Sequence, residues 1–281
     1  FDFNLKKLCK YNVIFIIFAQ FVSSIFIFSN TTNIYQVILD QNIWFIILST
    51  STSISAGYII NNFYDSDKDL INRPLKTILE NEISGRTKLF TYIVLNILTI
   101  LFSLLVSLKA LIFFSFYTLG IFIYSIKLSK YLFIGNFISV MLVITPFFAI
   151  TVYYKNFSLE IFTHAIFLFF VILIKELIKD LENLKGDFTM NYKTIPVLYG
   201  ENWTKRYIIL FVVFTIGISL NLSLNYDIHQ MKVYYLFSIP FFIFFIYLML
   251  KFNSRKHYIL LHNALKILII AGLFSITLHG S

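Results

Sequence analysis

The chain has 281 residues, of which 58% are hydrophobic and only 13% are charged, and it contains 34 Phe and 18 Tyr. This composition excludes an ordinary soluble domain, whose water-facing surface requires many more charged residues. The net charge of +9 would suit a nucleic-acid-binding protein, but its distribution follows membrane topology, and we expect no nucleic-acid partner.

Apolar runs close to the length of about 20 residues that crosses a bilayer recur along the whole chain. They predict an all-α integral membrane protein: one polytopic domain over residues 1–281, with nine transmembrane helices in one bundle and a central cavity open toward the cytoplasm. The expected spans are residues 12–29, 43–60, 89–107, 110–126, 132–153, 161–178, 207–224, 233–250 and 258–277.

The first run follows three lysines, as the apolar part of a signal peptide would. We expect it to be a retained membrane helix, because the run is long and the segment 29–33 has no small-x-small cleavage pattern. Cys9 is the only cysteine, which excludes an internal disulfide and a thiolate metal cluster.

The second run ends in an acidic stretch, Asn61-Asn62-Phe63-Tyr64-Asp65-Ser66-Asp67-Lys68-Asp69. Asn62, Asp65 and Asp69 follow one another at spacings of three and four residues, which places them on one face of a helix, with Asp67 off that face. Carboxylates near a bilayer are costly and usually mark a functional site.

The third and fourth runs are almost continuous and are interrupted only around Ser107 and Lys109. This interruption predicts a tight helical hairpin.

The sixth run ends in a second acidic stretch, Asp180-Leu181-Glu182-Asn183-Leu184-Lys185-Gly186-Asp187. Asp180, Asn183 and Asp187 repeat the spacing of three and four, which suggests two related halves. We expect Glu176 to join this face or to pair with Lys175 or Lys179. The remaining polar neighbours have simpler expected roles: Glu182 in solvent, and the isolated histidines, His262 among them, as structural residues.

Hard oxygen ligands without nearby His or Cys suit magnesium, which takes a few carboxylates together with substrate phosphate oxygens. The two acidic faces therefore predict magnesium sites that clamp a diphosphate. The alternative for one such stretch alone is an ordinary solvated loop, which two matched stretches on the same side disfavour.

The basic residues test the topology, because cytoplasmic loops are enriched in Lys and Arg. If alternate loops share a side with the N-terminus, the opposite side receives only Lys109, Lys155 and Lys232, and Lys266 falls inside the last span. We therefore expect a multi-pass cell-membrane protein with the N-terminus and both acidic motif loops in the cytoplasm and the C-terminus outside.

These motifs resemble those of the UbiA-type intramembrane prenyltransferases. That family's first motif, Asn-Asp-x-x-Asp-x-x-x-Asp followed by Asn-Arg-Pro, resembles Asn61 to Asp69 with Asn72-Arg73-Pro74. Its second, Lys-Asp-x-x-Asp-x-x-Gly-Asp followed by Thr-x-Pro-Val, resembles Lys179 to Asp187 with Thr194-Ile195-Pro196-Val197. Tyr124-Ser125-Ile126-Lys127 matches a smaller Tyr-Ser-x-Lys element. Asn62 and Asn183 each stand where the family usually carries an aspartate.

The resemblance implies that the chain transfers an isoprenyl group from its diphosphate to an acceptor. It also implies that Mg²⁺ is the cofactor and that the protein is surrounded by membrane lipid. The metal and the diphosphate would be held by the acidic residues Asp65, Asp69, Asp180 and Asp187, assisted by Asn61, Asn62 and Asn183. The departing diphosphate would be stabilised by Arg73, Lys127 and Lys179.

The second motif and the segment Thr194 to Gly200 resemble most closely the enzymes that join geranylgeranyl to geranylgeranylglycerol phosphate, so we expect a phosphate-bearing lipid acceptor. A hydrophobic aromatic acceptor, such as homogentisate or a hydroxybenzoate of quinone synthesis, is the alternative. A cation or proton transporter could also place carboxylates in a helical bundle, but its carboxylates would be expected near the bilayer midplane.

Overall fold

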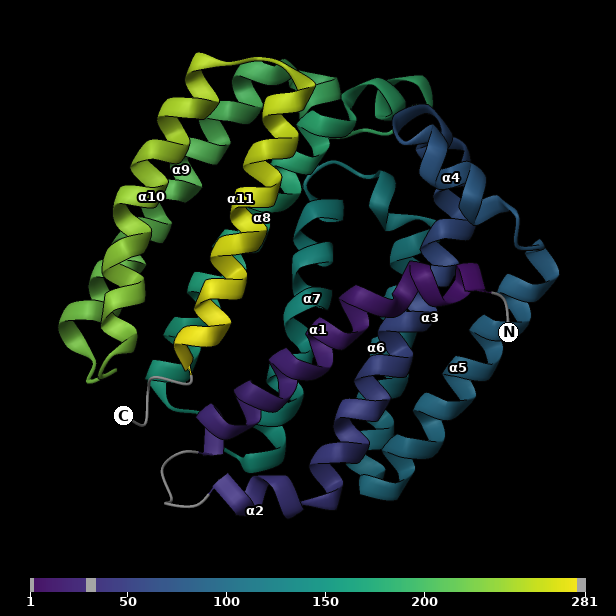
Figure 1. The fold of residues 1–281 in the computed structure, drawn as a ribbon, viewed down its shortest axis with the longest axis vertical. Coiled ribbons are helices and arrows are strands. Elements are labelled where there is room, and N and C mark those ends of the chain that lie inside the picture. The colour runs from purple at the N-terminus through teal and green to yellow at the C-terminus, as the bar shows by residue number, and fades with distance from the viewer. Residues whose placement is uncertain (1–2, 29–33, 277–281) are drawn as a thin grey trace. The chain divides into compact units, whose positions relative to one another are not determined.

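The computed structural model describes residues 3–28 and 34–276, and every regular element in these ranges is a helix (Figure 1). The helices are α1 (Phe3–Phe28), α2 (Ile34–Leu39), α3 (Gln41–Asn72), α4 (Pro74–Asn81), α5 (Gly85–Val106), α6 (Leu108–Ile126), the 3₁₀ helix η1 (Leu128–Lys130), α7 (Ile134–Tyr154), α8 (Leu159–Thr189), α9 (Ile195–Asn225), α10 (Met231–Lys251) and α11 (Arg255–Ile276). The expected all-α class is confirmed.

Eight helices in the described ranges are long and apolar enough to cross a membrane: α3 and α5 to α11. The described apolar part of α1 is the shorter stretch Val13–Ile27, so the ninth span stays a prediction. Residues 29–33, where we expect no signal cleavage, lie outside the described residues. The side of the membrane on which each loop and terminus lies also stays a prediction.

Both acidic motifs are helical, as their spacing predicts, and do not lie in the inter-helix loops to which the topology argument assigned them. The first motif lies on α3, a helix of 32 residues, and the second on α8, a helix of 31 residues. Both helices continue well beyond the apolar runs, because the polar residues that end an apolar run are compatible with helix, and the chain meets no proline until Pro74 in one case and Pro196 in the other.

The expected hairpin between the third and fourth runs is confirmed. Ser107 is the single residue between α5 and α6, and it has an extended backbone with φ −176° and ψ 164°. Its side-chain oxygen accepts a hydrogen bond from the Ala110 N–H at 3.1 Å. Ser107 therefore ends one helix and caps the next, as a serine at an N-cap does.

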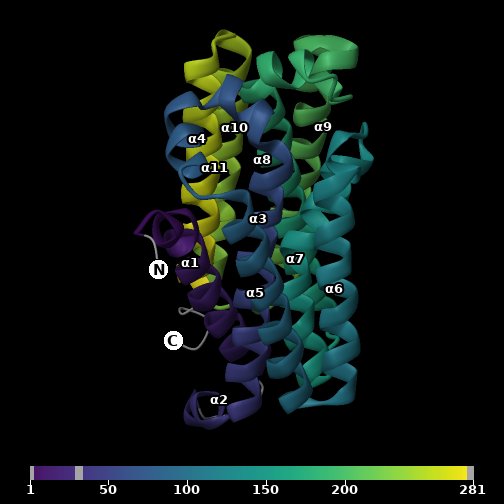
Figure 2. The ribbon, with the colours of Figure 1, turned by 90° about the vertical axis from the view of Figure 1, so that its right-hand side faces the viewer.

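The helices divide into two compact units. Unit 1 comprises residues 1–129 and 145–154, and α3 is its central helix, in contact with α1, α4, α5 and α6. Figures 1 and 2 both show α5 and α6 running alongside α3. In the apolar window of α3, 56% of the residues are buried, against 11% in α5. The helix that carries the first motif is thus the core of its unit.

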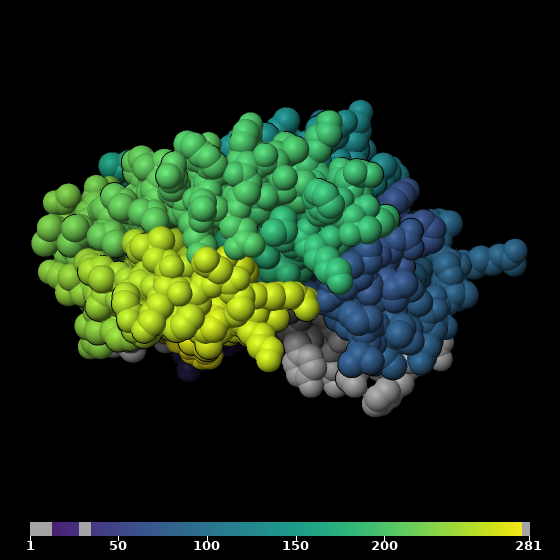
Figure 3. Space-filling model, turned by 90° about the horizontal axis from the view of Figure 1, so that it is seen from above, coloured from purple at the N-terminus to yellow at the C-terminus, as the bar shows by residue number. Residues whose placement is uncertain are grey.

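Unit 2 comprises residues 130–144 and 155–281, and α8 occupies the corresponding position. It packs against α9 and α11, which both contact α10, and 61% of its apolar window is buried. Helix α9 is broken at Gly200, whose φ of +82° suits glycine because it has no Cβ. Figure 3 looks onto this end of unit 2, where the green start of α9 lies beside the yellow start of α11.

Candidate functional site

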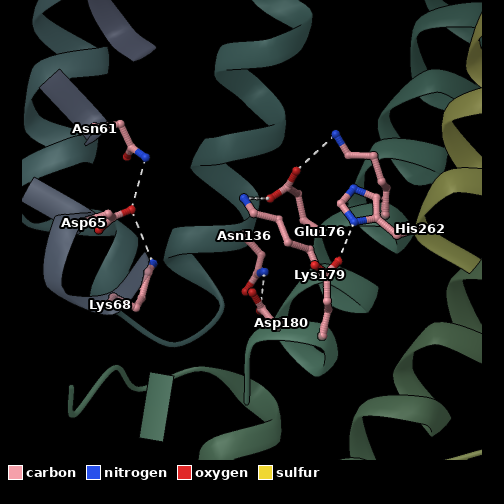
Figure 4. A network of polar contacts seen from close by, with 10 residues as sticks. Asn61, Asp65, Lys68, Asn136, Glu176, Lys179, Asp180 and His262 are labelled. Carbon is pink, nitrogen blue, oxygen red and sulfur yellow. Dashed lines mark hydrogen bonds and ion pairs between the residues drawn. The ribbon is translucent and has the colours of Figure 1, made fainter. Parts of the chain in front are cut away.

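The first acidic face is organised around Asp65. This side chain is buried, with 6% of the residue exposed, and its Oδ2 accepts hydrogen bonds from Asn61 Nδ2 at 3.1 Å and from Lys68 Nζ at 3.3 Å (Figure 4). Asn61, Asp65 and Lys68 lie one turn apart on α3, so the helix itself brings them together. The amide that contacts Asp65 is thus Asn61, and not Asn62 as the spacing predicts.

Asp69 and Arg73 lie where α3 passes into α4. Asp69 is half-buried one turn after Asp65, and its backbone oxygen accepts a hydrogen bond from the Arg73 N–H at 2.6 Å. Arg73 is the residue between the two helices, and Pro74 begins α4, a position that proline tolerates because the missing N–H would have no partner there. Asp67 is exposed, as its position off the acidic face predicts.

Asn62 is engaged elsewhere. Its Nδ2 donates to Glu80 Oε2 on α4 at 2.6 Å, and its Oδ1 accepts from Lys88 Nζ on α5 at 2.8 Å. All three residues are buried. The structure therefore brings Asn62 together with Glu80 and Lys88 rather than with Asp65.

The second acidic face lies on α8. Asp180 Oδ2 accepts a hydrogen bond from Asn136 Nδ2 on α7 at 2.8 Å (Figure 4), and Asp187 is buried, with 3% of the residue exposed. Asn183 lies between these two residues in the sequence and is buried, and its Oδ1 has no hydrogen-bond partner within the described part of the chain. A buried amide oxygen without a partner is costly, which is a reason to look for a bound cation or donor at this position.

The candidate basic residues have different surroundings. Lys179 Nζ lies 3.0 Å from Glu176 Oε2, and Lys175 Nζ lies 3.2 Å from Glu176 Oε1, so the expected pairing of Glu176 with these lysines is confirmed (Figure 4). The Lys179 side chain keeps 39% of its surface exposed. Lys127 is exposed at the end of α6 in unit 1. Exposed lysines of this kind can reach a phosphate as mobile point charges.

The expectation that Glu182 is solvated is wrong. Only 6% of Glu182 is exposed, its Oε2 lies 2.9 Å from His262 Nδ1, and its backbone oxygen accepts from Arg255 Nε at 3.1 Å. Glu182 points away from the acidic face of α8 toward α11, which packs against that side of the helix. The pair links α8 to α11, which agrees with a structural role for His262.

We expect His262→Leu to lower the melting temperature of the detergent-solubilised protein, since the buried Glu182 carboxylate would lose this partner. Removing one partner of a buried hydrogen bond costs about 1–3 kcal/mol. The matched control is His229→Leu, because the His229 side chain is 53% exposed. Equal melting temperatures for the two variants would contradict the structural role of His262.

The donor atoms suit a magnesium ion that completes its shell with substrate oxygens. In the described part of the chain, no three His, Cys, Asp or Glu side chains gather closely enough to hold a metal by themselves. Each acidic face instead offers carboxylate and amide oxygens, and the partnerless Asn183 Oδ1 is an available hard ligand. Magnesium usually takes one or two carboxylates plus phosphate oxygens, so these residues fit it.

Sequence reasoning missed four members of these networks: Asn136, Glu80, Lys88 and His262 as the partner of Glu182. The available signals were that Asn136 interrupts an apolar run and that Lys88 directly precedes the expected third span. The cytoplasmic charge bias is by itself a sufficient explanation for a lysine at position 88. Neither signal indicates a partner, because the partners lie on other helices.

Comparison with known proteins identifies the fold. The sequence profile of the UbiA prenyltransferase family matches residues 14–263. Digeranylgeranylglyceryl phosphate synthase of Saccharolobus solfataricus is 29% identical over 195 residues, which is 66% of this chain and 67% of the relative. The synthase of the same name from Methanosphaera stadtmanae is 29% identical over 202 residues, or 72% of this chain and 71% of the relative.

Solved structures agree with this match. A digeranylgeranylglyceryl phosphate synthase structure superposes with a TM-score of 0.74 and 22% identity, covering 98% of this chain and 97% of that chain. A UbiA homologue from Archaeoglobus fulgidus, bound to GPP and Mg²⁺, superposes with a TM-score of 0.69 and 14% identity, covering 98% and 99%. At these identities the structures establish a shared fold.

Proposed function

This chain belongs to the UbiA prenyltransferase family, and from that membership we propose that it transfers a geranylgeranyl group from geranylgeranyl diphosphate to geranylgeranylglycerol phosphate, with Mg²⁺ as cofactor. Its relatives named digeranylgeranylglyceryl phosphate synthase support the choice of acceptor. The UbiA homologue bound to GPP and Mg²⁺ supports the choice of donor class and metal. Family membership also favours a transferase over the transporter that the carboxylates alone would allow.

The observation that carries the proposal is the buried Asn183 Oδ1, which lacks a partner beside the carboxylates of α8. We assign the metal-facing oxygens to Asp65, Asp69, Asp180 and Asp187, with Asn61 and Asn183 as neutral donors. Asn62 is the exception in this set, because Glu80 and Lys88 already occupy both ends of its amide.

In the proposed reaction, the bond between C1 of the prenyl chain and its diphosphate oxygen breaks and the diphosphate leaves. The acceptor hydroxyl oxygen forms an ether bond to C1, and its proton passes to the released diphosphate or to solvent. Bound magnesium would neutralise the diphosphate charge that develops. Arg73, Lys127 and Lys179 would bind the departing phosphate oxygens. The apolar helices would keep water away from the allylic cation, which water would otherwise capture.

Asn136 orients Asp180 through the 2.8 Å hydrogen bond, so we expect Asn136→Leu to raise the magnesium concentration required for half-maximal activity. Loss of a hydrogen bond to a metal ligand typically costs about 10–100-fold in metal affinity or activity. Magnesium titration of the prenyl-transfer rate measures the effect. Asn96→Leu is the control, because Asn96 donates only to its own helix at Tyr92; an equal shift in both variants would contradict this role.

The direct test incubates the purified protein with geranylgeranyl diphosphate and magnesium, together with geranylgeranylglycerol phosphate or, in parallel, homogentisate. Mass spectrometry then follows the prenylated product. A prenylated glycerol phosphate is the expected result. A product formed only with homogentisate would assign the enzyme to quinone synthesis. Absence of product with both acceptors would contradict the proposed substrates.

A further inference from the structure

Helix α4 of unit 1 is amphipathic in the opposite sense to a helix on a soluble protein. Its polar residues Thr77 and Glu80 are 1% and 6% exposed, whereas Leu75, Ile78 and Leu79 are 81%, 56% and 52% exposed. Figures 1 and 2 both show α4 beside the end of α3 that carries the acidic face, and the two helices are in contact. The buried face of α4 is therefore held in place by polar contacts, and not by burial of the two leucines and the isoleucine.

Those contacts converge on three buried side chains from three helices. Asn62 on α3 donates to Glu80 on α4 at 2.6 Å and accepts from Lys88 on α5 at 2.8 Å. Lys88 Nζ also reaches Asn81 Oδ1 at 3.3 Å, and Lys76 Nζ lies 3.3 Å from Glu80 Oε1. We call Asn62, Glu80 and Lys88 the α4 anchor.

The chemistry of Lys88 and Glu80 determines which kind of side chain can stand between them. An ammonium group has only donors and an ionised carboxylate has only acceptors, so the residue between Lys88 and Glu80 must accept on one side and donate on the other. An amide does both. A carboxylate at position 62 would satisfy Lys88 but would face Glu80 across a 2.6 Å contact with no proton to share.

We infer that the α4 anchor is a positioning device for the first acidic face: it fixes α4, and through it Arg73, against the part of α3 that carries Asp65, and Asn62 acts as the linking amide instead of a metal ligand. This inference rests on the proposed function for its catalytic consequence. Its structural part does not, since the anchor exists without substrate.

An exchange of roles tests the inference. Asn62→Asp should weaken the anchor, because two carboxylates then face each other. Adding Glu80→Gln should restore it, since the amide introduced at position 80 can donate to the carboxylate introduced at position 62, which still accepts from Lys88. The net charge of the anchor is then the same as in the unaltered protein. Contacting residues in one network are energetically coupled, so we expect an effect of about tenfold and its reversal.

The first readout needs no activity. Trypsin cleavage after Lys76, which is exposed on α4, and hydrogen exchange of residues 74–84 report how often α4 detaches. We expect cleavage about tenfold faster in Asn62→Asp than in the unaltered protein, and near the original rate in Asn62→Asp with Glu80→Gln. The matched control is Asn62→Asp with Glu82→Gln, which removes the same charge from an exposed neighbour and should leave cleavage fast.

The second readout is the magnesium dependence of prenyl transfer. We expect Asn62→Asp to raise the magnesium requirement and lower the rate, and the added Glu80→Gln to reverse both changes. If Asn62 were a ligand, Asn62→Asp alone would lower the magnesium requirement and Glu80→Gln would not interact with it, which would overturn the inference. Equal cleavage rates in all variants would overturn it too, whereas anchor-dependent cleavage without any prenyl transfer would reject only the proposed function.

Discussion

Asp65→Asn should reduce the kcat/KM of prenyl transfer by more than about 100-fold, because the loss of a group that only orients a metal ligand already costs about 10–100-fold. Asp65 is the buried carboxylate at the centre of the first acidic face, where Asn61 and Lys68 hold its Oδ2. Asparagine keeps the size of the side chain and removes its charge. Steady-state kinetics at saturating magnesium and at limiting magnesium separate a loss of metal binding from a loss of rate.

Asp67→Asn is the matched control, since Asp67 is an exposed aspartate two residues along the same helix. It removes the same charge from the same stretch and should keep nearly full activity. Similar losses in the two variants would mean that the overall negative charge of the stretch matters and that Asp65 has no special place in it.

Asn183→Leu is expected to have the second large effect. Leucine has the same number and branching of side-chain heavy atoms as asparagine, but it removes the oxygen that has no hydrogen-bond partner among the described residues. If that oxygen is a metal ligand, the magnesium concentration for half-maximal rate should rise by about 100-fold, at the upper end of the range for groups around a bound metal. The titration should be repeated at several donor concentrations, because substrate phosphates share the metal.

Asn183→Asp should change the magnesium requirement in the opposite direction. A carboxylate adds negative charge to the ligand set, so the magnesium requirement should fall below that of the unaltered protein. Asn202→Leu serves as the control, since Asn202 is exposed near the start of α9. If Asn183→Leu binds magnesium normally, the assignment of the second acidic face is wrong.

The two asparagines that replace family aspartates should therefore respond differently to the same substitution. Restoring aspartate at position 183 is expected to help magnesium binding, and restoring it at position 62 is expected to harm the α4 anchor. The sequence presents both as equivalent departures with the same spacing to their neighbours. Only their hydrogen-bond partners distinguish them: Glu80 and Lys88 surround Asn62, whereas Asn183 Oδ1 has none.

Local features of the chain were predictable. Apolar runs predicted the long helices. The break at Ser107 predicted the hairpin between α5 and α6, because a serine that can cap the following helix is a local signal. The spacing of three and four grouped Asn62 with Asp65 and Asp69, but in the structure Asn61 contacts Asp65 and Asn62 pairs with Glu80 and Lys88. The ends of α3 and α8 were not predictable from hydropathy, because helix propensity continues where apolar character stops.

By itself the sequence determined the all-helical membrane class and the family, since hydropathy runs and motifs depend on residues close together in the chain. The tertiary structure alone decided which polar groups are partnered. The decisive hydrogen bonds join residues that lie far apart in the sequence. The separation is 18 residues for Asn62 and Glu80, 26 for Lys88 and Asn62, 44 for Asn136 and Asp180, and 80 for His262 and Glu182. A buried polar side chain takes its role from the helix packed against it, and no local pattern specifies that helix.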